Sequence, residues 1–377
     1  MKLSDILAGC FVTFAVPAIA WPGMAEMTKR IAEANRHHSG QDGQELIGDL
    51  KKNGATSPTG RLIADILQGR VDAQSDEAGY EAPGPFGSPE CSADVCCVWS
   101  HVSDALTNLF RGPSSRCNGN ARAAIRLGFH DAGTWSKRLA ERGQDFGGAD
   151  GSIILSRGEM SRPDNRGLRP IIDQTRALGE EFGVGFGDLV QFMAIHAVVT
   201  CPLGPRFRVF VGRIDSDQEA PTGLLPQVTA PVEDLIQMFE DKTISPLELI
   251  ALVGAHSTSR QFFVDRARTG APQDDTPGVW DTKFYNVTLG EAPRGVFKFE
   301  SDIKLSTHPG LANDWRSFID PVAGQRRWDR LYARAYTRLS LLGVNNINRK
   351  FSDSFPHCTL NPKRNSNPTP REKRTYS

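Results

Sequence analysis

RLGFHDAGTWSKRLAERGQDFGGADGS, residues 126–152, contains an arginine and a histidine four positions apart, followed by a spaced set of oxygen-bearing side chains. The residues from Ala123 to Leu127 favour helix, and Gly133 is a natural end for it. Arg126 and His130 should therefore share one helix face. A guanidinium beside an imidazole suits a reaction in which a proton moves while negative charge grows on an oxygen. An exposed pair with a purely structural role is the alternative.

Oxygen ligands follow this pair closely. Asp131 comes directly after His130, and the glycine-rich loop 147–152 contains Asp150 and Ser152 two positions apart. Calcium takes six to eight oxygens from carboxylates, hydroxyls and carbonyls. The pattern therefore predicts a calcium site, with an Asp-Gly turn that binds no metal as the alternative.

The N-terminus reads as a secretory signal peptide, residues 1–20. Lys2 precedes an apolar run over 6–16, and small residues stand before Trp21. The run is too short to span a bilayer, so we expect a secreted protein without a membrane anchor. Lys+Arg 44 against Asp+Glu 44 gives no sign of a nucleic-acid partner. Asn286 begins an Asn-Val-Thr glycosylation acceptor that suits an extracellular location.

Removal of the signal peptide leaves six of the seven cysteines, and an even number in a secreted chain implies disulfides. Residues 21–88 read as an N-terminal extension or pro-segment that ends in the Pro/Gly linker EAPGPFGSPE. The main domain is expected at 89–360, followed by a disordered basic tail, 361–377. Helical periods recur, and only PRFRVFVGR, 205–213, alternates like a strand. The fold should be mostly α.

A second histidine lies on another predicted helix. Ser245 and Glu248 form a capping-box pattern at the start of the run that ends in Gly-Ala-His256. Ser257 follows at once, and DDTPGVWD, 274–281, supplies a second group of oxygen ligands. His196, by contrast, lies within an apolar run, where a hydrogen-bonded core histidine is the default expectation.

Together these motifs resemble the plant, fungal and bacterial haem peroxidase superfamily, and within it the secreted fungal class II, or ligninolytic-type, peroxidases. The resemblance covers roughly Cys91 to Cys358. It implies a two-lobed, mostly helical monomer with haem b between a distal and a proximal lobe and with two calcium ions. It also implies a hydrogen-peroxide-dependent enzyme that oxidises phenolic or similar small aromatic donors in one-electron steps through a ferryl intermediate.

The resemblance also assigns roles to single residues. On the distal side it makes Arg126 and His130 the catalytic pair, with Phe129 beside the haem, where intracellular relatives usually have Trp. On the proximal side it makes His256 the axial ligand of the haem iron. The residues that support the two histidines in the family correspond to Glu159 and Asn165 on the distal side and Asp302 on the proximal side.

The calcium ligands and disulfides follow in the same way. Cys91–Cys97 and Cys117–Cys201 match family bridges, whereas Asn313 replaces the usual partner of Cys96 and leaves Cys358 as the candidate. The distal calcium ligands implied are Asp131, the Gly148 carbonyl, Asp150 and Ser152, and the proximal ones are Ser257, Asp274, Thr276, the Val279 carbonyl and Asp281.

Departures from the family narrow the substrate. Gly119, Ala123 and Phe262 stand where manganese-oxidising relatives have carboxylates, and Ala251 stands where lignin peroxidases have a radical-forming surface Trp. Gln273 replaces a proximal Phe. A generic peroxidase acting on small donors is therefore favoured, with another Trp or Tyr as a conceivable surface relay. The alternatives are a non-catalytic secreted calcium- or haem-binding protein, or a manganese or lignin peroxidase with a relocated oxidation site.

Overall fold

The computed structural model describes residues 45–75 and 80–350. The expected signal peptide, the basic tail and Cys358 lie outside the described residues. Within them the chain is helical, as the sequence predicts, and the secondary structure contains no β-strand. The helices of the first half are α2 (Gly48–Asn53), α3 (Pro58–Leu67), α4 (Pro89–Ser92), α5 (Val95–Phe110), η1 (Pro113–Ser115), α6 (Gly119–Ala132), α7 (Lys137–Ala140), α8 (Ser152–Leu155), α9 (Arg157–Met160), η2 (Pro163–Asn165), α10 (Arg169–Phe182) and α11 (Phe186–Thr200).

The second half continues with helices only. These are α12 (Val232–Glu240), α13 (Pro246–Val253), η3 (Gly254–Thr258), η4 (Arg266–Arg268), α14 (Lys283–Leu289), α15 (Glu300–Thr307), α16 (Ala312–Ser317), α17 (Gly324–Leu339) and α18 (Ile347–Lys350).

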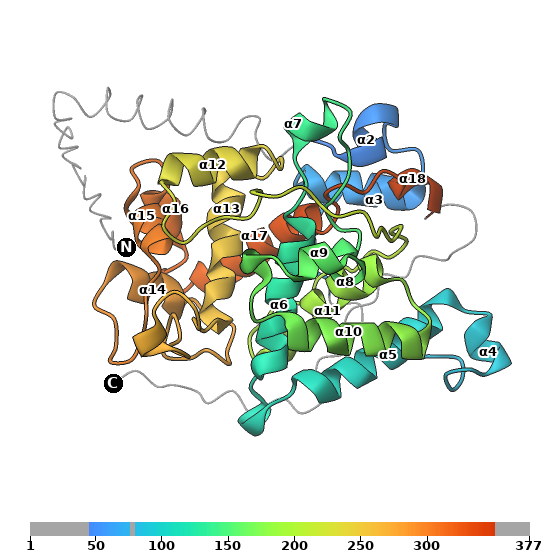
Figure 1. Cartoon of the computed structure of the whole chain (residues 1–377), viewed down its shortest axis with the longest axis horizontal. Helices are drawn as coiled ribbons and strands as arrows, with labels where there is room; N and C mark the ends of the chain where they lie inside the picture. The colour runs from blue at the N-terminus through green and yellow to red at the C-terminus, as the bar shows by residue number, and fades with distance from the viewer. Residues whose placement is uncertain (1–44, 76–79, 351–377) are drawn as a thin grey trace, which may run out of the picture. The chain divides into compact units, whose positions relative to one another are not determined.

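Helix α11 forms the centre of one group of helices. Thirteen of its 15 residues are buried, from Gly187 to Val199. A helix that is apolar on all sides must be enclosed by others, and α11 packs against α5, α6 and α10. The Cys117–Cys201 disulfide joins a cysteine two residues before α6 to the residue directly after α11. These contacts fix the direction of α6 (Figure 1).

Helices α12 to α16 form a second group, which lies to the left of α6 in Figure 1. Helix α13 packs against α17, and α14 packs against α15 and η3. The capping box predicted at the start of α13 is present: the Ser245 hydroxyl accepts from the Glu248 N–H, and the Glu248 carboxylate accepts from the Ser245 N–H. A well-defined start of α13 sets the position of η3, which carries His256.

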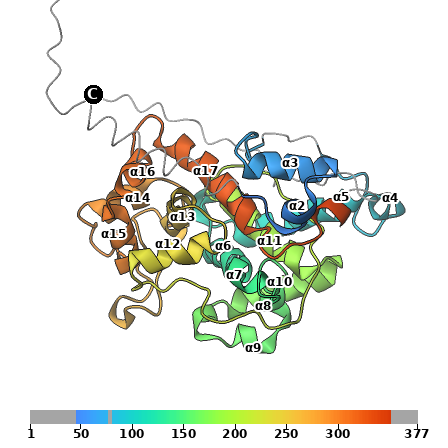
Figure 2. The same cartoon turned by 90° about the horizontal axis from the view of Figure 1, so that it is seen from above.

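Residues 45–75 belong to the same core as the rest of the described chain. Helices α2 and α3 lie beside α18 in both views (Figures 1 and 2), and α3 packs on α17. Ile63, Ile66 and Leu67 of α3 are fully buried. The buried Arg338 of α17 donates to the backbone carbonyl of Leu67 at 3.0 Å. The domain boundary expected at residue 88 therefore does not mark a boundary in packing.

The strand expected at 205–213 does not form. Phe207 makes only an isolated antiparallel bridge to Gln74 of the N-terminal segment. Two backbone hydrogen bonds flank the bridge: the Ser75 N–H donates to the Arg206 carbonyl and the Arg208 N–H donates to the Ala73 carbonyl, both at 3.1 Å. No single helix of the described ranges is long and apolar enough to cross a membrane; α10 and α11 meet that length and composition only as a pair bent by 115°.

Candidate active site

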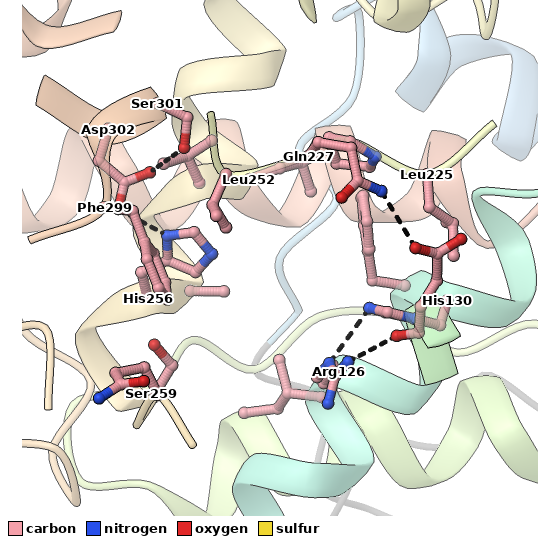
Figure 3. Close-up of a pocket in the computed structure, with 18 of the residues that line it drawn as sticks. Arg126, His130, Leu225, Gln227, Leu252, His256, Ser259, Phe299, Ser301 and Asp302 are labelled. Carbon is pink, nitrogen blue, oxygen red and sulfur yellow. Dashed lines mark hydrogen bonds and ion pairs between the residues drawn. The ribbon is translucent and has the colours of Figure 1, made fainter. Parts of the chain in front are cut away.

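A cavity of about 470 Å³ separates the two helix groups, and both predicted histidines line it. His130 and Arg126 lie on one wall and His256 on the opposite wall (Figure 3). Most of the wall between them is apolar, formed by side chains such as Phe129, Leu252 and Phe299. Such a cavity, with few and well-placed polar groups, is typical of a cofactor or ligand site.

Helix α6 presents Arg126 and His130 toward this cavity. The helix is started by Asn118, whose side chain accepts from the Asn120 and Ala121 N–H groups at 2.9 and 3.1 Å. One turn apart, Arg126 Nε donates to Nε2 of His130 at 3.2 Å. Nε2 is then an acceptor, so the ring proton is assigned to Nδ1.

Asn165 supports that assignment. Its Oδ1 lies 2.9 Å from Nδ1 of His130, so it accepts the ring proton, and its own amide donates to the Glu159 backbone carbonyl at 2.9 Å. Glu159 thus acts on Asn165 through its main chain. Burial, reinforced by the Arg126 charge and opposed by the Asn165 contact, lowers the pKa of His130 to about 3. The imidazole is therefore neutral near pH 7, with a lone pair on Nε2.

Arg126 is fixed by two further hydrogen bonds. Its Nη1 donates to the Arg166 carbonyl at 2.9 Å and its Nη2 to the Asp164 carbonyl at 2.7 Å. Burial lowers its pKa to about 10, so the guanidinium stays charged in neutral solution. The cavity wall therefore combines a fixed positive charge with a neutral base.

On the opposite wall His256 is held by Asp302. Nδ1 of the ring donates to Oδ2 of Asp302 at 2.9 Å, and the carboxylate is almost fully buried. Phe284 and Phe299 meet the imidazole edge-on at 5.7 and 5.3 Å between centroids. The other nitrogen, Nε2, is left available toward the cavity (Figure 3). A glycine is needed two residues earlier, because a Cβ on Gly254 would lie 2.2 Å from the Tyr285 hydroxyl.

The first group of expected calcium ligands is a buried cluster of oxygens. Asp131 Oδ1, Ser152 Oγ and Glu159 Oε1 are buried without a hydrogen-bond partner. Burial, and then the charges of Asp150 and Glu159, raise the pKa of Asp131 well above its ordinary value. Buried carboxylates with free oxygens are costly unless a cation is present. The side-chain set fits Ca²⁺, and the Glu159 carboxylate is a member that the sequence did not indicate.

The second group has the same character. Ser257 Oγ and Asp274 Oδ2 are buried without a partner. Burial is the main cause that raises the pKa of Asp274 to about 7. Thr276 donates to Asp281 at 2.9 Å, and its own carbonyl accepts from the Val279 N–H at 2.9 Å. These oxygens also fit a hard cation.

Several other residues singled out in the sequence have structural roles outside the cavity. His196 is fully buried and bonded to Thr107 Oγ1 at 2.9 Å, as expected for a core histidine. Gln273 is buried and bonded to Ser259, but it does not line the cavity. The structure contains the Cys91–Cys97 and Cys117–Cys201 disulfides, while the Cys96–Cys358 pairing involves a residue outside the described ranges.

None of the tryptophans in the described part of the chain is a surface residue. Trp99, Trp135, Trp280, Trp315 and Trp328 are at most 8% exposed. Ala251, at the position of the family's radical-forming Trp, is itself buried. No tryptophan of the described residues is therefore exposed enough to accept an electron from a donor at the protein surface.

The family described as Peroxidase matches residues 98–320. A protein named Peroxidase from Coprinopsis cinerea is 36% identical over 309 residues, 74% of this chain and 83% of its own length. A second Peroxidase, from Arthromyces ramosus, is 36% identical over 73% of this chain and 80% of its own length. Ligninase LG5 from Phanerodontia chrysosporium is 32% identical over 60% of this chain and 66% of its own length.

Proposed function

The chain belongs to the peroxidase family, whose members are hydrogen-peroxide-dependent haem oxidoreductases, and we propose that the cavity between His130 and His256 is its active site. The observation that carries this proposal is the set of contacts around His130. Its Nδ1 proton is held by Asn165 and its Nε2 faces Arg126, so a neutral base and a fixed cation stand together in an apolar cavity.

The residues present fit haem b. Nε2 of His256 is free to bind iron because Nδ1 is held by Asp302, and Phe129, Leu252 and Phe299 supply apolar walls. When bound, the haem supplies the iron that binds the peroxide and the electrons that reduce it. Asp302 orients the His256 ring and increases the basicity of its free nitrogen.

The proton transfer and the stabilisation of negative charge are carried out by His130 and Arg126. Nε2 of His130 takes the proton from the inner oxygen of hydrogen peroxide and delivers it to the outer oxygen, which leaves as water. The Arg126 guanidinium stabilises the negative charge that develops on the departing oxygen. Asn165 keeps the imidazole in the tautomer that this transfer needs.

Calcium at the two oxygen clusters is part of the same proposal. One ion would be held by Asp131, Ser152 and their neighbours, and the other by Ser257, Asp274 and theirs, each directly after a site histidine in the chain. The buried oxygens without partners in both clusters support this assignment. The ions would fix the segments that follow His130 and His256.

We further propose small aromatic donors rather than manganese. Among the described residues that line the cavity the only carboxylates are Asp164 and Asp302, and Asp302 is engaged with His256. Phe262 lines the wall instead of a carboxylate. Divalent manganese prefers oxygen ligands, and the described residues of this wall do not bring several carboxylates together to bind it.

We propose, from the first 20 residues of the sequence, that the protein is secreted. Two disulfides in the described chain and an exposed Asn286 in its glycosylation acceptor support it. The ratio of protein in the culture medium to protein in cells, for the chain with and without residues 1–20, would test it.

The test of the catalytic proposal is rapid mixing of the haem-loaded protein with hydrogen peroxide, followed through the haem absorption band. His130→Ala should slow the spectral change by about 10²- to 10⁴-fold, the range for loss of a general base. The resting haem spectrum should stay the same, because His256 is untouched. Equal rates in the two proteins would refute the role of His130 and favour a non-catalytic haem-binding protein.

A further inference from the structure

Three apolar side chains are exposed at the entrance of the cavity. Phe262, Phe263 and Val264 are consecutive, line the cavity, and are 49%, 46% and 48% exposed. Isolated exposed apolar residues need no explanation, but three together at the entrance of a site indicate a binding surface.

The loop that carries these side chains is built around one buried residue. Gln261 is 3% exposed, and its backbone bonds to both Ala271 and Gly270 across the loop. Its side chain donates to the carbonyls of Asp265 and Arg268 and accepts from the Asp265 N–H. The backbone of the loop is thus held in shape from inside, which fixes the positions from which the two phenylalanine side chains extend.

The same entrance is positively charged. Four arginines line the cavity, and Arg166 and Arg260 are the two exposed ones. The Arg166 guanidinium lies 5.5 Å from the centre of the Phe263 ring, while Arg260 donates to the Gly270 carbonyl. In the described chain neither forms an ion pair with a carboxylate, and the one acidic side chain near them on the wall, Asp164, accepts from Gln227.

We propose that this rim, formed by Arg166, Arg260, Phe262 and Phe263, selects phenolic donors that carry a carboxylate. The donor ring lies on the phenyl groups and its carboxylate pairs with the two guanidinium groups. The proposal rests on the peroxidase function above. In each turnover one hydrogen peroxide oxidises two such phenols, each of which loses one electron and its phenolic proton, and yields two waters.

Haem carries two carboxylates of its own, which also need cations. Arg122 and Arg126, the other two arginines of the wall, are partly buried and hydrogen-bonded to backbone carbonyls. Arg166 and Arg260 are the exposed pair and are therefore accessible to a donor that arrives from solution. A measurement of haem retention shows whether these arginines pair with the carboxylates of haem or with the carboxylate of the donor.

The experiment compares ferulate with methyl ferulate, two donors with the same phenol that differ in one charge. For the haem-loaded wild-type protein we expect kcat/KM for ferulate to exceed that for the ester about five-fold at low ionic strength, chiefly through KM, and the preference to shrink in 0.5 M salt. In the double variant Arg166→Gln/Arg260→Gln the ratio should fall to about one, with the ester affected less than about two-fold. Arg142→Gln, at an exposed arginine outside the cavity wall, should leave the ratio unchanged.

Two results would overturn the proposal. One is an equal kcat/KM for the two donors in the wild-type protein. The other is a double variant that keeps the preference for ferulate over methyl ferulate. If that variant also lost haem to apomyoglobin faster than the wild type, the two arginines would serve the cofactor instead of the donor. A haem-loaded wild-type protein that oxidises neither donor would be a failure of the peroxidase proposal itself, and is distinguishable because no rate exists to compare.

Discussion

Oδ2 of Asp302 lies 2.9 Å from Nδ1 of His256, although the two residues are 46 positions apart in the chain. Asp302 belongs to α15 and His256 to η3, so the contact depends on how α13, α14 and α15 pack. It is the contact that frees Nε2 of His256 toward the cavity.

Asp302→Asn should weaken haem binding by about 10- to 100-fold. A neutral amide accepts the His256 Nδ1–H hydrogen bond more weakly than a carboxylate does, so the Nε2 of His256 becomes a weaker ligand. The measurement is the rate of haem transfer to apomyoglobin. Asp173→Asn, at an exposed carboxylate on α10 that pairs with Arg169, is the control and should bind haem as the wild type does. An unchanged transfer rate in Asp302→Asn would show that the Asp302 contact is only structural.

The calcium content should respond to each oxygen cluster separately. Asp131→Asn and Asp274→Asn each replace a carboxylate that has an unpartnered buried oxygen with a neutral group of the same shape. Each variant should purify with one calcium ion fewer by elemental analysis, and chelation should lower the melting temperature of the wild type by mass action. Wild-type protein without calcium after exhaustive dialysis against buffered Ca²⁺ would contradict both assignments.

Lys242 predicts a pH dependence of stability. Its side chain is fully buried, its Nζ has no hydrogen-bond partner, and burial lowers its pKa from 10.5 to about 8, although the Asp241 charge opposes the shift. The folded chain binds this proton more weakly than the unfolded chain. The free energy of unfolding should therefore rise with pH between about 8 and 10.5.

Lys242→Met removes this cost and should stabilise the protein at pH 7 by about 1–3 kcal/mol, as estimated from the pKa shift. The advantage should shrink by about 1 kcal/mol at pH 9, where the wild-type lysine is largely neutral. Urea unfolding at both pH values measures it. Lys304→Met, at an exposed lysine paired with Glu300, should change stability by less than about 0.5 kcal/mol. A destabilised Lys242→Met would refute the argument.

We propose that residues 45–75 are part of the mature fold and not a removable pro-segment. Deletion of residues 1–75 would uncover α17 and remove the carbonyl of Leu67 from the buried Arg338. The truncated chain should lose its cooperative unfolding transition. Leu67→Ala in the full chain offers a milder test and should cost about 2–5 kcal/mol. If processing by a protease that removes this segment left the melting temperature unchanged, the pro-segment interpretation would be correct.

The sequence alone determined the local features of this protein. Arg126 and His130 share a helix face because four positions make one turn, and the capping box fixes the start of α13 because its bonds join residues three apart. The helical character of the chain follows from the same short-range periodicity. Such interactions are settled by neighbours in the chain, so their spacing can be read directly.

Asn165 and Asp302 were assigned only through the family resemblance, because nothing near them in the chain marks them as partners of a histidine. The tertiary structure also decided three features that the sequence pattern did not show. The Glu159 carboxylate joins the first oxygen cluster, and Phe207 forms only an isolated bridge to Gln74 instead of a strand. The Leu67 carbonyl accepts a hydrogen bond from the buried Arg338, 271 positions away in the chain. Each depends on contacts between distant segments, whose free energy exists only after the helices have packed.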